Sequence, residues 1–326
     1  MIGIVGAGVA GARLVEHLSG LAPLAIHDRD PQRAARLAML HRSSVLPVMS
    51  VRLADLGACS VVVVACATPH ANLVKACVEG GAHVVSLSDD LADVVTMLNR
   101  STDVSARRRT VVVGAAASPG LTSLLVGQAS TSFDSIDEVH VAVHGTGGPD
   151  CARQHHRALG GEALGWHDGN WLRRRSGSGR EMCWFPEPVG ARDCYRAELA
   201  DAIVLRRAFP HLRRISVRTS ARRRDLLMAR FPMLSPPNPK GGIGAVRVEV
   251  RGHRGIAREV VVLGIAERLA QIAAAVASST VQCLYNDPAS WEPGSRVLGE
   301  SDLPNEMILA GVMAAGVRVH RCVGSP

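Results

Sequence analysis

Aromatic side chains and lysine are both scarce in this chain of 326 residues. Phe, Trp and Tyr together make up 3% of the residues, and among 37 basic residues only Lys75 and Lys240 are lysine. Proteins that bind single-stranded nucleic acids stack the bases on aromatic side chains interleaved with basic ones. With so few aromatics, the many arginines do not predict such binding, and we expect no nucleic-acid partner.

Long apolar runs are also missing. A membrane-spanning helix needs about 18 consecutive apolar residues, and no segment approaches this, because even the alanine-rich stretch after Arg268 carries Gln271. The N-terminus has no basic residues before its first apolar run, so it does not resemble a signal peptide. The sequence therefore predicts a cytoplasmic protein with no membrane partner.

The eight cysteines form no Cys-x-x-Cys pair. Some of them, such as Cys66 and Cys77, lie in apolar runs, where a thiol behaves as a small hydrophobic side chain. We expect no disulfide framework, in agreement with a reducing compartment.

A metal site is not expected either. His140 and His144 lie on a predicted strand, where residues four apart are separated by about 13 Å. No His-Glu-x-x-His motif accompanies them or the later group of Cys151, His155 and His156.

The positive charge is concentrated in the middle of the chain. Residues 126–265 hold 22 basic and 14 acidic residues, whereas residues 1–125 have a net charge of +2 and residues 266–326 of −2. A locally basic cleft attracts anions. We expect a small anionic substrate, although an arginine-rich solvated surface would give the same count.

The first 125 residues alternate between short apolar strands and helical patterns. The predicted strands are residues 2–5, 24–27, 61–65, 83–87 and 110–113. Continuous β-branched runs such as 61–64 are typical of strands buried on both faces of a parallel sheet. The sequence predicts an α/β fold for this part, with a doubly wound parallel sheet.

The pattern changes after Gly120. Alternating segments at 136–143, 214–219, 244–251 and 258–263 predict a mainly antiparallel sheet. A glycine-rich insert at 144–193 predicts loops, and helices are expected at 265–284 and 305–315, with a last strand at 317–320. We expect a second, α+β domain over 126–284 that binds substrate and forms a homodimer, while 285–326 returns to the first domain.

A glycine motif follows the first strand. Gly6, Gly8 and Gly11, with Val9 and Ala10 between the last two, form Gly-x-Gly-x-x-Gly at the start of a helix. The first glycine allows the tight turn, the second lets the backbone reach a pyrophosphate, and the third allows close packing of helix and strand. The motif predicts a Rossmann-type domain that binds a dinucleotide at the helix N-terminus.

Asp28 ends the second strand, 20 residues after Gly8. Its carboxylate can accept hydrogen bonds from an adenosine ribose and would repel a 2′-phosphate, which favours NAD. Arg29 favours NADP, because its guanidinium can pair with that phosphate. We expect NAD or NADP as cofactor, with a slight preference for NAD.

Three further segments carry a family resemblance. Residues 61–90 read VVVVACATPHANLVKACVEGGAHVVSLSDD, residues 114–122 read GAAASPGLT, and Leu303-Pro304-Asn305-Glu306 precedes a helix. The chain resembles the saccharopine dehydrogenase-like (saccharopine reductase) family. The resemblance implies a nicotinamide-dependent oxidoreductase acting at a carbon–nitrogen bond of an amino-acid-derived substrate. Ser118 departs from the family, which has Asp before the corresponding proline.

Ligands of such sheets bind outside the carboxyl ends of the strands. We therefore expect Ala67, Thr68 and Pro69, after the strand at 61–65, and Ser88, after the next strand, to line the nicotinamide half of the cleft.

The proton donor is expected in the insert. His155 and His156 are predicted acid–base residues, since histidine titrates near neutral pH, and Arg153 is predicted to bind a substrate carboxylate. An exposed polar helix start would explain the same residues.

Four more residues are candidates. Asp168 is predicted to orient a histidine or bind a substrate amine, although Asp168-Gly169 also suits a hairpin turn between tryptophans. The predicted substrate-binding residues also include Arg180, Tyr195 and Lys240. Because these catalytic groups are sparse, a regulatory or sensor protein that binds NAD(P) without catalysis remains the alternative function.

Overall fold

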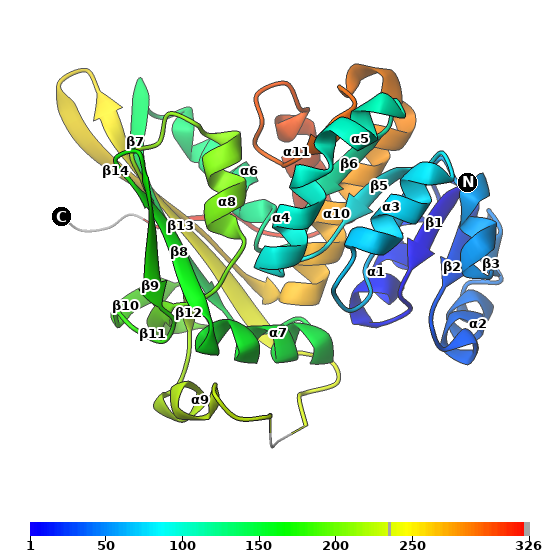
Figure 1. The fold of residues 1–326 in the computed structure, drawn as a ribbon, viewed down its shortest axis with the longest axis horizontal. Helices are drawn as coiled ribbons and strands as arrows, with labels where there is room; N and C mark the ends of the chain where they lie inside the picture. The colour runs from blue at the N-terminus through cyan, green and yellow to red at the C-terminus, as the bar shows by residue number, and fades with distance from the viewer. Residues whose placement is uncertain (234–235, 323–326) are drawn as a thin grey trace.

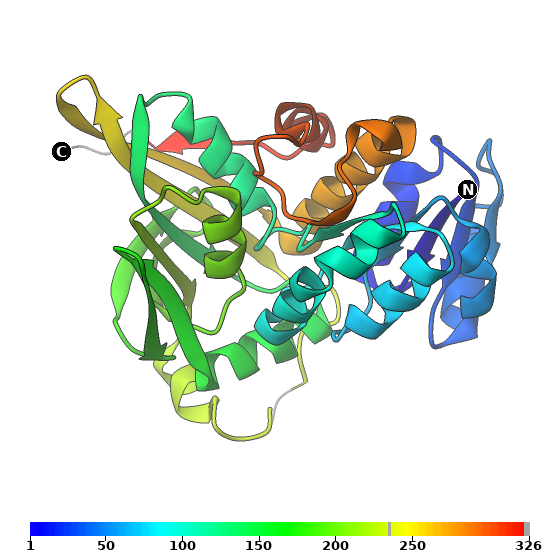
Figure 2. The same cartoon turned by 45° about the horizontal axis from the view of Figure 1, so that its top comes forward.

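The computed structural model describes residues 1–233 and 236–322, which form two β-sheets joined by helices. Figure 1 shows the first sheet beside the N-terminus and the second at the opposite end of the molecule, with α6, α10 and α11 between them. The 45° view of Figure 2 shows the same side-by-side arrangement.

The first sheet has seven parallel strands in the order β15-β6-β5-β4-β1-β2-β3. This order and the uniform direction confirm the predicted doubly wound sheet. The strand bounds are β1 (Ile2–Val5), β2 (Leu24–His27), β3 (Val48–Ser50), β4 (Val61–Val64), β5 (His83–Ser86), β6 (Thr110–Val113) and β15 (Gly294–Arg296).

Helices cover both faces of this sheet. Ile2 and Ile4 of β1 face one hydrophobic cluster with α1 and α10, whereas Val5 faces another with α3 and α4. Because both faces are covered, the strands are apolar throughout. The helices are α1 (Val9–Leu18), α2 (Pro31–Leu40), α3 (Ala71–Glu79), α4 (Leu91–Asn99), α5 (Ser101–Ala106), α10 (Leu269–Asn286) and α11 (Asn305–Ala314), with 3₁₀ turns η1 (Leu53–Ala58) and η2 (Pro288–Ser290).

The second sheet is mixed and mostly antiparallel, as predicted. Its main path runs β10-β11-β12-β7-β13-β14-β16, and only β12 and β7 are parallel along it. Its strands are β7 (Ser135–His144), β8 (Glu162–His167), β9 (Asn170–Arg175), β10 (Glu181–Phe185), β11 (Gly190–Arg196), β12 (Arg214–Ser220), β13 (Ile243–Arg254), β14 (Ala257–Arg268) and β16 (His320–Cys322). The helices of this half are α6 (Leu121–Ser130), α7 (Pro149–Gly160), α8 (Asp201–Ala208) and α9 (Arg223–Met228).

The insert at 144–193 differs from the prediction of loops. It contains α7 and the strands β8 to β11. Strand β9 reads NWLRRR and pairs only with β8, so it is an edge strand without the apolar alternation by which buried strands are recognised. The helix expected from Ile265 begins at Leu269, because β14 continues its pairing with β13 as far as Arg268.

The end of the chain contributes to both sheets. Strand β15 pairs with β6 in the first sheet, whereas β16 pairs with β14 in the second. The last strand lies at 320–322 rather than at the predicted 317–320.

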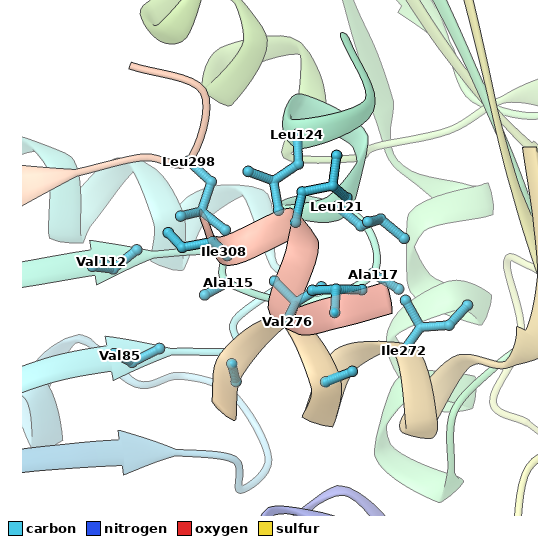
Figure 3. Close-up of a cluster of buried hydrophobic side chains, with 14 of the residues drawn as sticks. Val85, Val112, Ala115, Ala117, Leu121, Leu124, Ile272, Val276, Leu298 and Ile308 are labelled. Atoms are coloured by element: carbon cyan, nitrogen blue, oxygen red, sulfur yellow. The ribbon is translucent and has the colours of Figure 1, made fainter. Parts of the chain in front are cut away.

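One hydrophobic core runs through the contact between the two halves. Figure 3 shows Val85 of β5 and Val112 of β6 near Leu121 of α6, Ile272 of α10 and Ile308 of α11. The same cluster continues into the second sheet, so the two sheets are packed through α6, α10 and α11.

Across the described residues, none of the helices combines the length and the apolar character that crossing a lipid bilayer requires.

Candidate active site

The three glycines of the turn between β1 and α1 have different surroundings. Gly6 has a φ of +107°, and a Cβ there would lie 2.7 Å from the carbonyl oxygen of Ala65. A Cβ on Gly11 would lie 1.8 Å from the carbonyl oxygen of Gly6. Gly8 is exposed, and a Cβ on it would have no protein atom within 4 Å. The fold itself needs Gly6 and Gly11, whereas a side chain at Gly8 would begin in open space.

The first turn of α1 faces the same space. Its N-cap is Gly8, and no side chain caps the helix. The N–H groups at Val9 and Ala10 therefore remain available to an anion, which the positive end of the helix dipole also attracts.

Asp28 lies beside this turn at the end of β2. Its carboxylate accepts hydrogen bonds from the N–H of Ala7 at 2.7 Å and from the N–H of Asp30 at 2.9 Å. These bonds fix the carboxylate next to the glycine turn, and each oxygen keeps a further lone pair for a ligand hydroxyl. Arg29, the next residue, is exposed.

The loop after β4 is fixed by a buried hydrogen-bond network. His70 contacts the hydroxyl of Ser86 at 2.9 Å through Nδ1 and the carbonyl of Cys66 at 3.0 Å through Nε2. Asp93 accepts hydrogen bonds from the N–H of His70 and from the hydroxyl of Ser88, both at 2.7 Å. The Ser88 side chain is thus buried and engaged in the protein.

The three residues between Cys66 and His70 follow the carboxyl end of β4. Ala67 and Pro69 are exposed and Thr68 is partly buried, so their surfaces are open to the cleft side of the sheet. The structure thus leaves these three residues accessible to a cofactor, while Ser88 offers it no free hydroxyl.

Helix α7 belongs to the second half of the molecule and lies below α4 in Figure 1. A Cβ built on its N-cap, Gly148, would lie 3.7 Å from the side chain of Val9. Gln154 donates a 2.9 Å hydrogen bond from Nε2 to Asp90, the N-cap of α4. The second half of the molecule therefore contributes α7 as a neighbour of the glycine turn and of the start of α4.

Asp89 is the most perturbed carboxyl group at this place. Its pKa is raised to about 7, chiefly by burial and also by the neighbouring Asp90 and Asp201, while Arg157 on α7 acts in the opposite direction. Cys151, on the first turn of α7, lies beside Asp89, and burial together with that carboxylate raises the pKa of the thiol to about 12. Asp89 therefore exchanges a proton near neutral pH, while Cys151 stays a thiol.

The two histidines of α7 have other surroundings. Nδ1 of His155 lies 3.3 Å from the hydroxyl of Thr219 on β12, and burial lowers the pKa of His155 to about 4. Nε2 of His156 lies 2.8 Å from the carbonyl oxygen of Phe231. Both rings face the second sheet or its loops, whereas Asp89 lies at the carboxyl end of the first sheet.

Arg153 lies on the same helix and forms an ion pair with Asp150 at 2.6 Å. Arg157 donates a hydrogen bond to Oε1 of Gln154, and Gln154 in turn donates one to Asp90. Arg157 therefore lies close enough to Asp89 for its positive charge to act on that carboxyl group. Arg157 was not among the sequence candidates.

The other predicted substrate residues are dispersed. Asp168 has a φ of +42° in the β8–β9 hairpin turn and pairs with Arg213 at 2.9 Å. Arg180 pairs with Asp193 at 2.9 Å at the start of β10. Tyr195 is buried on β11, and Lys240 is exposed in the loop before β13. The loop of Lys240 packs on the segment before α7, where the N–H of Gly242 donates to the carbonyl oxygen of Thr146 at 3.4 Å.

Trp166 and Trp171 flank the Asp168 hairpin, with ring centroids 5.2 Å apart. This is the hairpin arrangement that the sequence offered as the other explanation of Asp168.

No group of three His, Cys, Asp or Glu side chains suited to a metal ion occurs within residues 1–233 and 236–322. His140 and His144 contact the hydroxyls of Ser216 and Ser220, each at 2.7 Å.

The sequence analysis missed Asp89 as an acid–base candidate. One signal was present, because a carboxylate directly after a parallel strand lies at the ligand-binding edge of the sheet. Its burial, however, depends on α7, which begins about 60 residues later in the sequence.

No family model matches the chain, and no curated protein matches it. Among solved structures, the chain is similar to apo saccharopine dehydrogenase (L-Glu forming) from Saccharomyces cerevisiae, with a TM-score of 0.69, 12% identity and 99% of each chain covered. It is also similar to DAP dehydrogenase from C. glutamicum in complex with DAP, with a TM-score of 0.53, 12% identity, and 96% of this chain and 98% of that chain covered. The chain therefore shares the overall fold of saccharopine dehydrogenase, the type of fold that its motifs predicted.

Proposed function

We propose that this protein is an NAD(P)-dependent oxidoreductase that acts on the C=N or C=O group of a small anionic substrate derived from an amino or keto acid. One observation carries the proposal. The uncapped N-terminus of α1 and the open space at Gly8 lie beside the start of α7, and Cys151 of the same helix lies beside a carboxyl group, Asp89, with a pKa of about 7. This arrangement suits a dinucleotide and a proton transfer together.

The residues of the turn fit the cofactor. The turn from Gly6 to Gly11 would hold the pyrophosphate, and the carboxylate of Asp28 would accept hydrogen bonds from the ribose hydroxyls. Residues 67–69 would line the part of the site that holds the nicotinamide. The bound cofactor supplies or accepts the hydride. Because the carboxylate of Asp28 is fixed beside the turn and would repel a 2′-phosphate, we favour NAD, with Arg29 as the feature that would admit NADP.

We assign the proton transfer to Asp89 in place of His155 or His156. A general acid works best when its pKa is near the working pH, which holds for Asp89. His155, with a pKa of about 4, carries no proton to donate as an acid at pH 7. Asp89 in its acid form can protonate the substrate nitrogen or oxygen, and its carboxylate can remove that proton in the reverse direction.

Arg157 and Arg153 are proposed to bind the anionic part of the substrate. Both lie on α7, and Arg157 is near Asp89. Guanidinium groups bind carboxylates through two parallel hydrogen bonds. This places the charged end of the substrate on the second half of the molecule and its reacting carbon toward the first sheet.

Calorimetric titration with NADH and NADPH, at low and at physiological salt, tests the cofactor. Binding of one or both is expected, followed by oxidation of NADH or NADPH in a screen of keto acids with ammonium or small amines. Failure to bind either dinucleotide would reject the proposal.

A second candidate is an NAD(P)-binding sensor without catalysis. The hydroxyl of Ser118, at the position where the resembled family has Asp, is engaged with the buried Asp201 and offers no group to the cleft. A protein that binds NADH, oxidises it with none of the substrates, and changes its oligomeric state on binding would support the sensor.

We also propose a domain organisation, a homodimer and a cellular compartment. Residues 1–125 form the cofactor domain with part of the 285–326 tail, and residues 126–284 form the substrate and dimerisation domain, from which α10 packs on β4 and β5. Met182 and Trp184, both exposed on β10, are the apolar side chains that a second copy would cover in a homodimer. The cytoplasm is the proposed compartment, since the seven cysteines from Cys59 to Cys283 are free thiols.

A further inference from the structure

The second sheet has a gap along one edge of β12. Strand β8 pairs with β12 at Arg214 and Ile215, and β11 pairs with the same edge at residues 218–220. Ser216 and Val217, between these two pairings, have no strand partner on this edge. A cavity of about 240 Å³ lies where β8 and β11 diverge.

Four arginines line this cavity. They come from three strands: Arg174 from β9, Arg196 from β11, and Arg214 and Arg218 from β12. Trp166 of β8 supplies an apolar wall. The strands thus bring together basic residues that are up to 44 positions apart in the sequence.

The arginines are incompletely neutralised. Arg218 pairs with Glu181 at 2.6 Å, and Arg214 lies 3.7 Å from Glu138. Among the described residues, no carboxylate lies within ion-pair distance of Arg174 or Arg196. The four guanidinium groups therefore exceed the nearby carboxylates by two charges.

One guanidinium nitrogen is also left without a partner. Nη1 of Arg218 is buried and makes no hydrogen bond within the described part of the chain. A buried N–H without an acceptor is energetically unfavourable, because it has lost its hydrogen bonds to water. Burial lowers the pKa of Arg196, and the charges of Arg218, Arg174 and Arg214 lower it further. An anion in the cavity would counter the repulsion between these four positive charges.

We propose that this cavity is a second ligand site, which binds a small multivalent oxyanion through Arg174, Arg196, Arg214 and Arg218. The excess of two charges suits a dianion, and the fork of each guanidinium suits phosphate or carboxylate oxygens. The cavity, at about 240 Å³, has room for an organic part beside the anionic group. A phosphate-bearing compound and a polycarboxylate share this chemistry.

The site is built from strands of the second sheet alone and does not include the glycine turn of the first. The proposal therefore stands apart from the proposed dehydrogenase activity.

The test is calorimetric titration of the whole protein with pyrophosphate and, separately, with citrate, at about 0.15 M salt. We expect a dissociation constant of about 1 mM or lower for at least one of them. The probe that binds more tightly identifies the phosphate or the polycarboxylate class. Binding of neither would overturn the proposal.

Variants locate the binding. The double variant Arg174→Gln/Arg214→Gln changes two exposed side chains, so the fold is retained, and it should weaken binding about tenfold or more. Arg173→Gln is the matched control, because Arg173 is adjacent on β9 and pairs with Glu162 outside the cavity. Equal affinity in the double variant would overturn the proposal.

The Gly8→Trp variant separates the two sites. It should retain oxyanion binding even though it blocks the space at the glycine turn. If oxyanion binding is lost in Gly8→Trp but kept in the double variant, the anion binds at the turn and the second site does not exist.

Discussion

Ser118 donates a 2.6 Å hydrogen bond to Oδ2 of Asp201, and this bond joins the turn before α6 to the start of α8. The hydroxyl of Thr122 donates to the other carboxylate oxygen at 2.7 Å. Asp201 is fully buried, and burial raises its pKa while the two hydroxyls lower it. The two hydroxyls therefore satisfy a carboxyl group that would otherwise be isolated in the core.

The Ser118→Ala variant should be less stable. It leaves one buried carboxyl oxygen without a donor, which lowers the free energy of unfolding by about 1–3 kcal/mol. Urea denaturation measures this loss. Ser130→Ala is the control, because the Ser130 hydroxyl donates only a local hydrogen bond, to the carbonyl oxygen of Gly127 within α6. Equal losses in the two variants would show that the bond to Asp201 contributes nothing specific.

Substitutions at Gly8 and Gly11 should have opposite consequences. Gly8→Trp should keep the melting temperature and abolish NADH binding, because Gly8 is exposed and its Cβ would meet no protein atom, while the indole would occupy the place of the pyrophosphate. Gly11→Ala should lower the melting temperature, because its Cβ would lie 1.8 Å from the carbonyl oxygen of Gly6. Calorimetry and thermal unfolding measure both. Unchanged NADH affinity in Gly8→Trp would refute the cofactor site.

Asp89→Asn should remove a pH dependence of stability. The pKa of Asp89 is about 7 in the folded protein and 3.8 in a free Asp. Between these values the folded state holds a proton that the unfolded state has lost, so stability falls as the pH rises through this window. Asn does not ionise, so the variant should be the more stable protein at pH 8, with the difference absent below pH 3.8.

The same variant should lose most of the oxidoreductase activity at pH 7, by about 10²-fold or more. Denaturation at several pH values is a readout independent of activity. A stability profile identical to that of the native protein would contradict the raised pKa of Asp89.

His155→Gln should change stability on the acid side. The pKa of His155 is about 4 in the folded protein against an ordinary value of 6.5. Between these values the unfolded state binds a proton that the folded state excludes, so the native protein loses stability as the pH falls from 6.5 to 4. The variant should lack this loss in thermal unfolding between these pH values, while its NADH affinity stays unchanged. If the variant loses the same stability between pH 6.5 and 4, another titrating group is responsible for that loss.

Asp28→Asn and Arg29→Ala should shift cofactor preference in opposite directions. Asn keeps an acceptor for the N–H of Ala7 but removes the charge that repels a 2′-phosphate, so the affinity for NADPH relative to NADH should rise about tenfold. Arg29→Ala removes an exposed cation and should lower that ratio. Titrations with both dinucleotides give the ratios, and no change in either variant would exclude these two residues from the ribose site.

The first sheet could be predicted because its signals are local. The β-branched run of β4 is buried on both faces, and backbone contacts require Gly6 and Gly11 at their positions in the turn. The insert could not be predicted in the same way. Strand β9 carries three consecutive arginines, and its pairing with β8 rather than an apolar face holds it in the sheet.

The sequence by itself determined the parallel sheet, the glycine turn with Asp28, and the excess of arginine in the middle of the chain. Only the tertiary structure decided which acidic group is perturbed and where the arginines gather. Asp89 acquires its high pKa because α7 covers it, and His155 loses its proton because Thr219 and the second sheet bury it. The pKa of a side chain and the charge of a cavity depend on groups distant in the sequence, so no local pattern contains them.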